Sequence, residues 1–176
     1  MPQWLFITLI VVGSLIGLWI LLFIVNLIFV GSFSAIFKGH KKAIVVILYT
    51  KLDNMKKLYS ILEKSGIKLD SKVKDALYDI GTTDFNEPGN ELFEKSKNAL
   101  SYVKDEIMFA SNEHPELSSN QEFVQNRKNV NELDTQYRNN VVMYNADVLG
   151  YNYWIRFLPC RFIFKMFKVK KKQIIS

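Results

Sequence analysis

Cysteine and histidine are scarce in this chain of 176 residues. Cys160 is the single cysteine, so the chain can form neither an internal disulfide nor a multi-cysteine metal site. The two histidines, His40 and His114, are far apart in sequence and give a metal site no nucleus. Glycine-rich phosphate loops, the nucleophile elbow and the His-Glu-x-x-His motif are also missing. We therefore expect no metal, no cofactor and no enzymatic activity, although paired-carboxylate catalysis stays open because no pair stands out.

Charged side chains and histidine are entirely missing from the 34 residues between Trp4 and Phe37. A helix of this length would measure about 51 Å, whereas about 20 apolar residues cross a hydrocarbon core of ~30 Å. The run is too long for a signal peptide and has no basic residue before it, although Ser32 and Ser34 leave cleavage open as an alternative. The sequence predicts a single-pass membrane anchor over residues 1–37.

The first basic residues follow this run at once, in a flank over residues 38–42 that contains Lys38, Lys41 and Lys42. Cationic flanks are retained on the cytoplasmic side of a membrane. We therefore expect a protein of the cell membrane with its N-terminus outside and its main domain in the cytoplasm. Residues 43–155 carry 13 Lys and Arg against 17 Asp and Glu, and an acidic middle of this kind gives no reason to expect nucleic-acid binding.

Helical periodicity dominates the chain after the anchor. Apolar residues recur at steps of three and four over residues 43–64, 69–80, 91–111 and 122–155, and loops separate these segments at residues 81–90 and 112–120. Only Gly39 separates the anchor from the first of these helices, so a continuous helix is compatible with the sequence. Asp70 is expected as the N-cap of the second of these helices, and Ser119 and Glu122 form a capping-box pattern before the last helix. The predicted fold is all-α, with the N-terminal transmembrane helix followed by an elongated antiparallel helical bundle over residues 43–158.

The last of these helices carries the clearest pattern, with two rows of residues spaced by seven. Such rows define a seam of the coiled-coil type that packs against partner helices. The predicted seam consists of Phe123, Val130, Tyr137, Val141, Tyr144, Val148, Tyr151 and Ile155. Arg127 and Asp134 interrupt its first half. We interpret them as two solvated charges at a bundle edge, with a pair across a shallow groove as the alternative.

Aromatic and basic residues alternate in the C-terminal tail, residues 159–176, which contains no acidic residue. Two interpretations are open: the tail lies on an anionic membrane surface, or its aromatic residues cap the bundle while its lysines stay in water. The residues predicted for membrane-surface contact are Arg161, Phe164, Lys165, Phe167, Lys168, Lys170, Lys171 and Lys172.

The second half of the chain also carries a recognisable set of residues. They are Pro115, Glu116, Leu117, Tyr144, Asn145, Tyr151, Asn152, Phe157 and Pro159. Their order and spacing resemble the LemA family of bacterial membrane proteins, which have a Pro-Glu-Leu motif and two Tyr-Asn pairs seven residues apart. The resemblance implies an N-terminal span followed by a helical bundle, and it implies no established reaction. Val141 and Val142 stand where LemA-like chains usually have arginine.

Two functions are compatible with these features. The first is a non-enzymatic, membrane-anchored scaffold or adaptor of the LemA type, with the lipid bilayer and a protein partner or a second copy as binding partners. Gly13 and Gly17 form a Gly-x-x-x-Gly pair that would let two anchors approach closely. The second is an enzyme or small-ligand receptor with a site between the bundle helices, where Arg127 and Asp134 are the residues to inspect.

Overall fold

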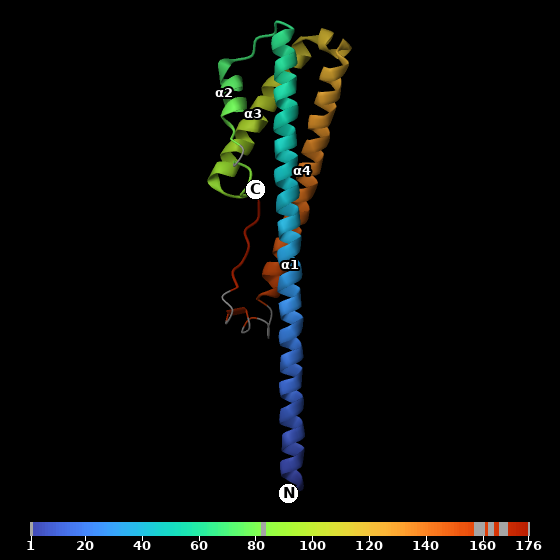
Figure 1. Ribbon diagram of the computed structural model, residues 1–176, viewed down its shortest axis with the longest axis vertical. Coiled ribbons are helices and arrows are strands. Elements are labelled where there is room, and N and C mark those ends of the chain that lie inside the picture. Colours follow the sequence, from blue (N-terminus) through green and yellow to red (C-terminus); the bar gives the residue numbers. More distant parts are fainter. Residues whose placement is uncertain (1, 82–83, 157–160, 162–163, 166–168, 176) are drawn as a thin grey trace. The chain divides into compact units, whose positions relative to one another are not determined.

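The computed structural model is built from helices (Figure 1). It describes residues 2–81, 84–156, 161, 164–165 and 169–175. The elements are α1 (Gln3–Lys64), α2 (Ser71–Asp79), α3 (Glu91–Glu113), the 3₁₀ helix η1 (Pro115–Ser119) and α4 (Gln121–Trp154). No strand occurs among these described residues, and the predicted all-α class is confirmed.

Helix α1 joins the predicted anchor and the first helix of the bundle without a break (Figure 1). Within the described residues it is the one helix long and apolar enough to cross a membrane. It ends at Lys64, and Gly66 forms the C-terminal cap, which we call the glycine stop. The N–H of Ile67 donates to the carbonyl of Leu62 at 3.0 Å, the N–H of Gly66 donates to that of Glu63 at 3.1 Å, and Gly66 has φ of 80°. This pair of hydrogen bonds closes the last turn of a helix when a residue without Cβ adopts a positive φ.

Short polar side chains begin the other α-helices. Asp70 accepts a hydrogen bond from the N–H of Lys72 at the start of α2, as predicted, and Asn90 accepts one from Phe93 at the start of α3. At α4 the carboxamide oxygen of Asn120 accepts from the N–H of Phe123 at 3.0 Å. The predicted capping box was wrong, because the Ser119 hydroxyl donates backwards to the carbonyl of Glu116.

Contacts divide the chain into two compact units. Unit 1 comprises Met1–Lys38 and Asp147–Lys172, and unit 2 comprises Gly39–Ala146 and Gln173–Ser176. Helices α1 and α4 each contribute residues to both units, whereas α2, α3 and η1 belong to unit 2 alone. The segment boundaries at residues 37, 42 and 158 were drawn from composition, and they stay a prediction.

The core of unit 2 is formed by apolar side chains from four helices and from the loop before α3. The largest fully buried ones include Ile44, Met55, Leu58, Leu62, Leu77, Phe85, Phe93, Leu100, Ile107 and Phe123. Phe85 lies edge-on to Phe93, with ring centroids 6.2 Å apart, and also to Tyr49 at 5.2 Å. Burial of large aromatic rings at such distances supplies much of the apolar area that stabilises a small helical core.

In unit 1 a row of aromatic residues on α1 packs against aromatic residues at the end of α4. Phe29 lies 4.5 Å from Trp154 between ring centroids, and Phe33 and Phe37 lie 5.8 and 5.3 Å from Tyr151. The three phenylalanines are four residues apart, so they share one face of α1. The end of the apolar run therefore packs on the end of α4 within unit 1.

Candidate functional site

The predicted seam of α4 is an inward face for most of its length. Among its eight residues, six are buried: Phe123, Val130, Tyr144, Val148, Tyr151 and Ile155. The other two, Tyr137 and Val141, are half-buried. The seam positions therefore build the interior of the two units and are not a free surface.

Asp134 lies between three helices and carries the densest charge cluster among the described residues of unit 2. Its carboxylate forms an ion pair with Lys51 from α1, with 2.5 Å between Lys51 Nζ and Asp134 Oδ1. It forms a second ion pair with Lys104 from α3. All three side chains are largely buried, with 9, 18 and 22% exposed for Lys51, Asp134 and Lys104. The interpretation of Asp134 as a solvated edge charge was wrong, because both lysines come from helices whose packing the sequence does not display.

The two ammonium groups control the ionisation of Asp134. Partial burial acts to raise the pKa of this carboxyl, but the hydrogen bonds from Lys104 and Lys51 outweigh burial and hold the pKa below its usual value. The carboxylate is therefore charged at neutral pH, and two cations facing one anion leave a net positive charge between α1, α3 and α4.

Unpaired polar atoms occur on α3 and α4 as well. The hydroxyl of Tyr137 and the Oε1 atom of Glu94 are buried without a hydrogen-bond partner among the described residues, and the other carboxyl oxygen of Glu94 pairs with Lys97. Burial and, to a smaller extent, the charge of Glu94 raise the pKa of Tyr137 to about 12. An unsatisfied buried hydroxyl costs about 1–3 kcal/mol, so a water or small polar ligand bound to this hydroxyl would be stabilising.

Arg127 differs from Asp134. It is exposed, as predicted, and its guanidinium is 3.5 Å from the hydroxyl of Ser111 on α3. The ion pairs of Asp134 are with Lys51 and Lys104, and Arg127 and Asp134 do not form one site.

The sequence analysis does not predict the lysine partners of Asp134, although the sequence contains a signal that these lysines are buried. Lys51 falls between Leu48 and Met55 at steps of three and four, on the apolar face of its helix. Lys104 takes the same kind of position in α3, four residues after Leu100. A basic residue on an otherwise buried face predicts an acidic partner elsewhere in the core.

The two Tyr-Asn pairs of α4 hold the backbone of the C-terminal tail. In unit 2 the carboxamide of Asn145 donates to the carbonyl of Ile175 at 2.8 Å and accepts from its N–H at 2.9 Å. In unit 1 Asn152 makes the same two bonds with Lys172, at 2.9 and 3.0 Å. The hydroxyl of Tyr144 donates to the carbonyl of Gln173 at 3.2 Å.

The spacing of these pairs has a geometric reason. Seven residues of α-helix rise about 10.5 Å, and three residues of extended chain span about 10 Å. Asparagines seven apart on α4 therefore meet residues three apart in the tail, Lys172 and Ile175. Each carboxamide offers one donor and one acceptor, which together satisfy both backbone groups of one tail residue. The motif is thus a pair of clamps for an extended peptide backbone.

The Pro-Glu-Leu motif forms the turn before α4. Pro115 begins η1, Leu117 is buried, and the exposed Glu116 accepts a hydrogen bond from His114 at 2.8 Å. These residues shape a connection and do not lie in the charge cluster of Asp134. Phe157 and Pro159, the last two residues of the motif set, lie outside the described residues.

The residues predicted for membrane-surface contact divide by burial. Phe164 is only 4% exposed within unit 1, whereas the basic ones that the structure describes are exposed: Arg161, Lys165, Lys170, Lys171 and Lys172. Phe167 and Lys168 lie outside the described residues. The described tail therefore presents positive charge at its surface and buries its aromatic ring.

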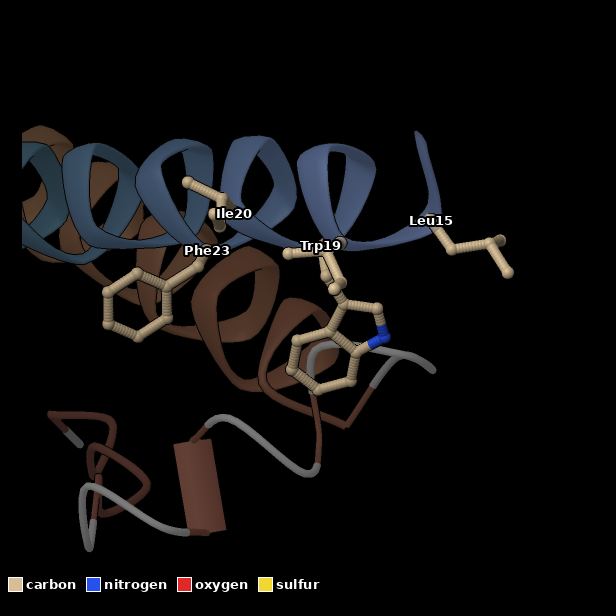
Figure 2. A pocket seen from close by; sticks show the side chains of 5 residues that line it. Leu15, Trp19, Ile20 and Phe23 are labelled. Carbon is tan, nitrogen blue, oxygen red and sulfur yellow. The ribbon is translucent and has the colours of Figure 1, made fainter. Parts of the chain in front are cut away.

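Helix α1 has an open hollow between large uncharged side chains near its N-terminus. Leu15, Ile16, Trp19, Ile20 and Phe23 line an open hollow of about 390 Å³. Figure 2 shows Leu15, Trp19 and Phe23 projecting from one side of the helix. A hollow lined by aliphatic and aromatic side chains suits hydrocarbon, and the indole nitrogen of Trp19 is the one polar side-chain atom of these five residues (Figure 2).

An apolar helix long enough to cross a membrane, joined to helices that clamp the C-terminal tail, defines an all-α protein with a candidate membrane anchor. The sequence model of the LemA family matches residues 43–176. The match covers well over half of the chain, so the chain belongs to the LemA family, as the resemblance predicted. No curated protein and no solved structure matches the chain.

Proposed function

We propose that this protein is a membrane-anchored, non-enzymatic helical scaffold that holds a partner protein, or a second copy of itself, at the cytoplasmic face of the cell membrane. The anchor is α1. From Trp4 to Val25 none of its residues is buried, and these 22 residues would rise about 33 Å, close to the ~30 Å of a hydrocarbon core. Asn26, at 2% exposed, is the first buried side chain after this stretch.

The single observation that carries the scaffold function is an exposed apolar stripe on α4. In unit 1, Leu149 and Tyr153 are 63 and 71% exposed. They are four residues apart, so they share one helix face. The seam of α4 faces inward, whereas this outer stripe has no cover within the described residues. A second apolar face on one helix is typical of a helix that packs on another protein.

Capture of partners from detergent-solubilised membranes tests this proposal. We expect the full-length protein to retain a stoichiometric partner or to self-associate. We expect the double variant Leu149→Glu and Tyr153→Glu to lose that association, because two carboxylates cannot be desolvated at an apolar contact. The matched control, Thr135→Glu with Asn139→Glu, adds the same charge at exposed polar positions of α4 and should behave as the wild type. Absence of both a partner and self-association would reject the scaffold.

Orientation is tested separately. The flank with Lys38, Lys41 and Lys42 supports a cytoplasmic main domain. Protease added to intact cells should leave residues 39–176 uncut, and protease added after lysis should digest them. Digestion in intact cells would reverse the orientation.

A second candidate function is a small-ligand receptor at the Asp134 cluster. It is favoured by the buried, unpaired hydroxyl of Tyr137, which follows Asp134 by three residues on α4, and by the net positive charge at Asp134. A ligand there would be small, polar and hydrogen-bonding. Loss of a co-purifying small molecule in Tyr137→Phe would support this second function, and absence of such a molecule from the wild-type protein would count against it.

A further inference from the structure

A pocket of about 460 Å³ in unit 1 gathers four basic side chains from the end of α4 and from the tail. We call it the cationic pocket. Its basic residues are Arg156, Arg161, Lys165 and Lys171, and its apolar lining residues are Ile155, Phe164 and Val169. Ile155 and Phe164 are 8 and 4% exposed, so the pocket has a buried apolar floor beneath charged walls.

The sequence from Arg156 onward carries no acidic side chain. Asp147 is the last Asp or Glu in the sequence, and seven Lys and Arg follow it. Four cations held around one cavity favour an anion with several acceptor oxygens, because guanidinium and ammonium groups form their strongest hydrogen bonds with phosphate and carboxylate. The pocket therefore suits a phosphate group.

The place of the pocket in unit 1 identifies the source of that phosphate. The rings of Trp154 and Phe29 of α1 lie 4.5 Å apart between centroids, and Arg156 follows Trp154 by two residues. Phe29 comes three residues after Asn26, where the uninterrupted exposed stretch of α1 ends. In an anchored protein this level is the boundary between hydrocarbon and water, where lipid phosphates lie.

We infer that the cationic pocket binds the phosphate headgroup of an anionic phospholipid from the bilayer that α1 crosses. The four basic residues would hold the phosphate, while the apolar floor would contact the glycerol and the first acyl carbons. A free phosphate ion would gain nothing from that floor. The inference rests on the anchor in the proposed function and adds a specific lipid class to it.

Native mass spectrometry of the full-length protein in a non-ionic detergent tests the inference. The probes are dioctanoyl phosphatidylglycerol, dioctanoyl phosphatidylcholine and inorganic phosphate, each titrated separately. We expect retention of one phosphatidylglycerol, with weaker retention of the other two. A single substitution, Arg161→Gln, should weaken phosphatidylglycerol binding about fivefold, since each basic residue near an anionic surface contributes about that factor.

The quadruple variant R156Q/R161Q/K165Q/K171Q should lose the bound lipid. Its matched control, K64Q/K68Q/K72Q/K95Q, removes the same charge from exposed positions of unit 2 and should keep the lipid. Circular dichroism checks that both remain helical, and the single variant carries the test if the quadruple variant unfolds. Equal binding of all three probes, or equal loss in both quadruple variants, would overturn the inference. A chain that stays in the membrane pellet but shows no lipid preference refutes the pocket alone, whereas a chain released from membranes refutes the anchor.

Discussion

Asp134 is a largely buried acidic residue whose two partners are far away in the sequence. One carboxylate joins Lys51 of α1 and Lys104 of α3 to α4, so it links three helices. Removing one member of a largely buried charge group leaves the others uncompensated, which costs more than the pair itself contributes. We expect Asp134→Asn to lower the free energy of unfolding by about 1–3 kcal/mol, measured by urea titration of the detergent-solubilised protein.

The control for this variant is Asp53→Asn. Asp53 pairs with Lys57 on the surface of α1, with side chains 63 and 53% exposed, and its loss should change stability by less than about 0.5 kcal/mol. Equal effects of the two substitutions would contradict a special role for Asp134.

Acid should remove the contribution of Asp134. Its pKa is lower in the folded than in the unfolded protein, so the stabilisation is complete above the unfolded pKa, near 4, and is lost as pH falls through the folded value. The difference in unfolding free energy between the wild type and Asp134→Asn should therefore be constant from pH 7 to about pH 5 and shrink below about pH 4. A difference that grows on acidification would refute the assignment.

A substitution of Tyr137 tests whether a water or a ligand binds its buried hydroxyl. Its hydroxyl is buried and unpaired among the described residues, so replacing it with hydrogen removes a cost and no bond. We expect Tyr137→Phe to leave the unfolding free energy unchanged or to raise it by up to about 1 kcal/mol. A clear loss of stability would mean that a water or ligand binds the hydroxyl, as in the second candidate function.

At the scale of elements, the glycine stop of α1 is a backbone feature with no packing component. Gly66 has φ of 80°, and a Cβ there would meet no atom within 4 Å. We expect Gly66→Ala to destabilise by about 1 kcal/mol through backbone strain alone. Gly39→Ala, within helix α1 and with equally open surroundings, should raise the free energy of unfolding by up to about 1 kcal/mol, with both variants measured by urea titration. The same sign for both would contradict the left-handed stop.

The two asparagine clamps make a prediction about the tail. Asn152→Ala removes both hydrogen bonds to Lys172, so the chain around the lysines 170–172 should be released from α4. Trypsin should then cleave after these lysines faster than in the wild type, by mass spectrometry of the products. Asn139→Ala, an exposed asparagine on the same helix, should not change the rate. An unchanged rate in Asn152→Ala would show that other contacts hold the tail.

Much of this element structure follows from the sequence because it is local. The period of apolar residues placed the helices, Asp70 was expected as a cap from its position, and the rows spaced by seven predicted the inward face of α4. The exchange of Ser119 for Asn120 at the start of α4 is a shift of one residue. Two adjacent capping residues of similar propensity are not separated by pattern alone.

The parts that could not be predicted are the long-range pairings. Lys51 and Asp134 are 83 positions apart, and Asn145 pairs with a tail residue 30 positions away. A single sequence shows which residues need a partner, such as a lysine on an apolar face or two asparagines at regular spacing. It does not show which residue supplies that partner, because this depends on the order in which helices pack.

At the scale of the whole molecule, each proposal depends on the position of α1 in lipid. If residues 4–25 cross the bilayer, the scaffold can hold its partner at the membrane and the cationic pocket can reach a lipid headgroup; otherwise neither is possible. The supporting facts are the missing charge between Trp4 and Phe37 and the exposure of apolar side chains on every side of α1 up to Val25. In water such a surface would be costly at about 25 cal/mol per Å².

Alkaline carbonate extraction of membranes from cells expressing the full-length chain tests this position most directly. We predict that the intact protein stays in the pellet and is released only by detergent. The variant Leu15→Arg with Leu18→Arg, which places two charges at the centre of the span, should appear in the supernatant to a large extent. Recovery of the intact, unprocessed wild-type protein in the aqueous supernatant without detergent would contradict the anchor and both proposals that depend on it.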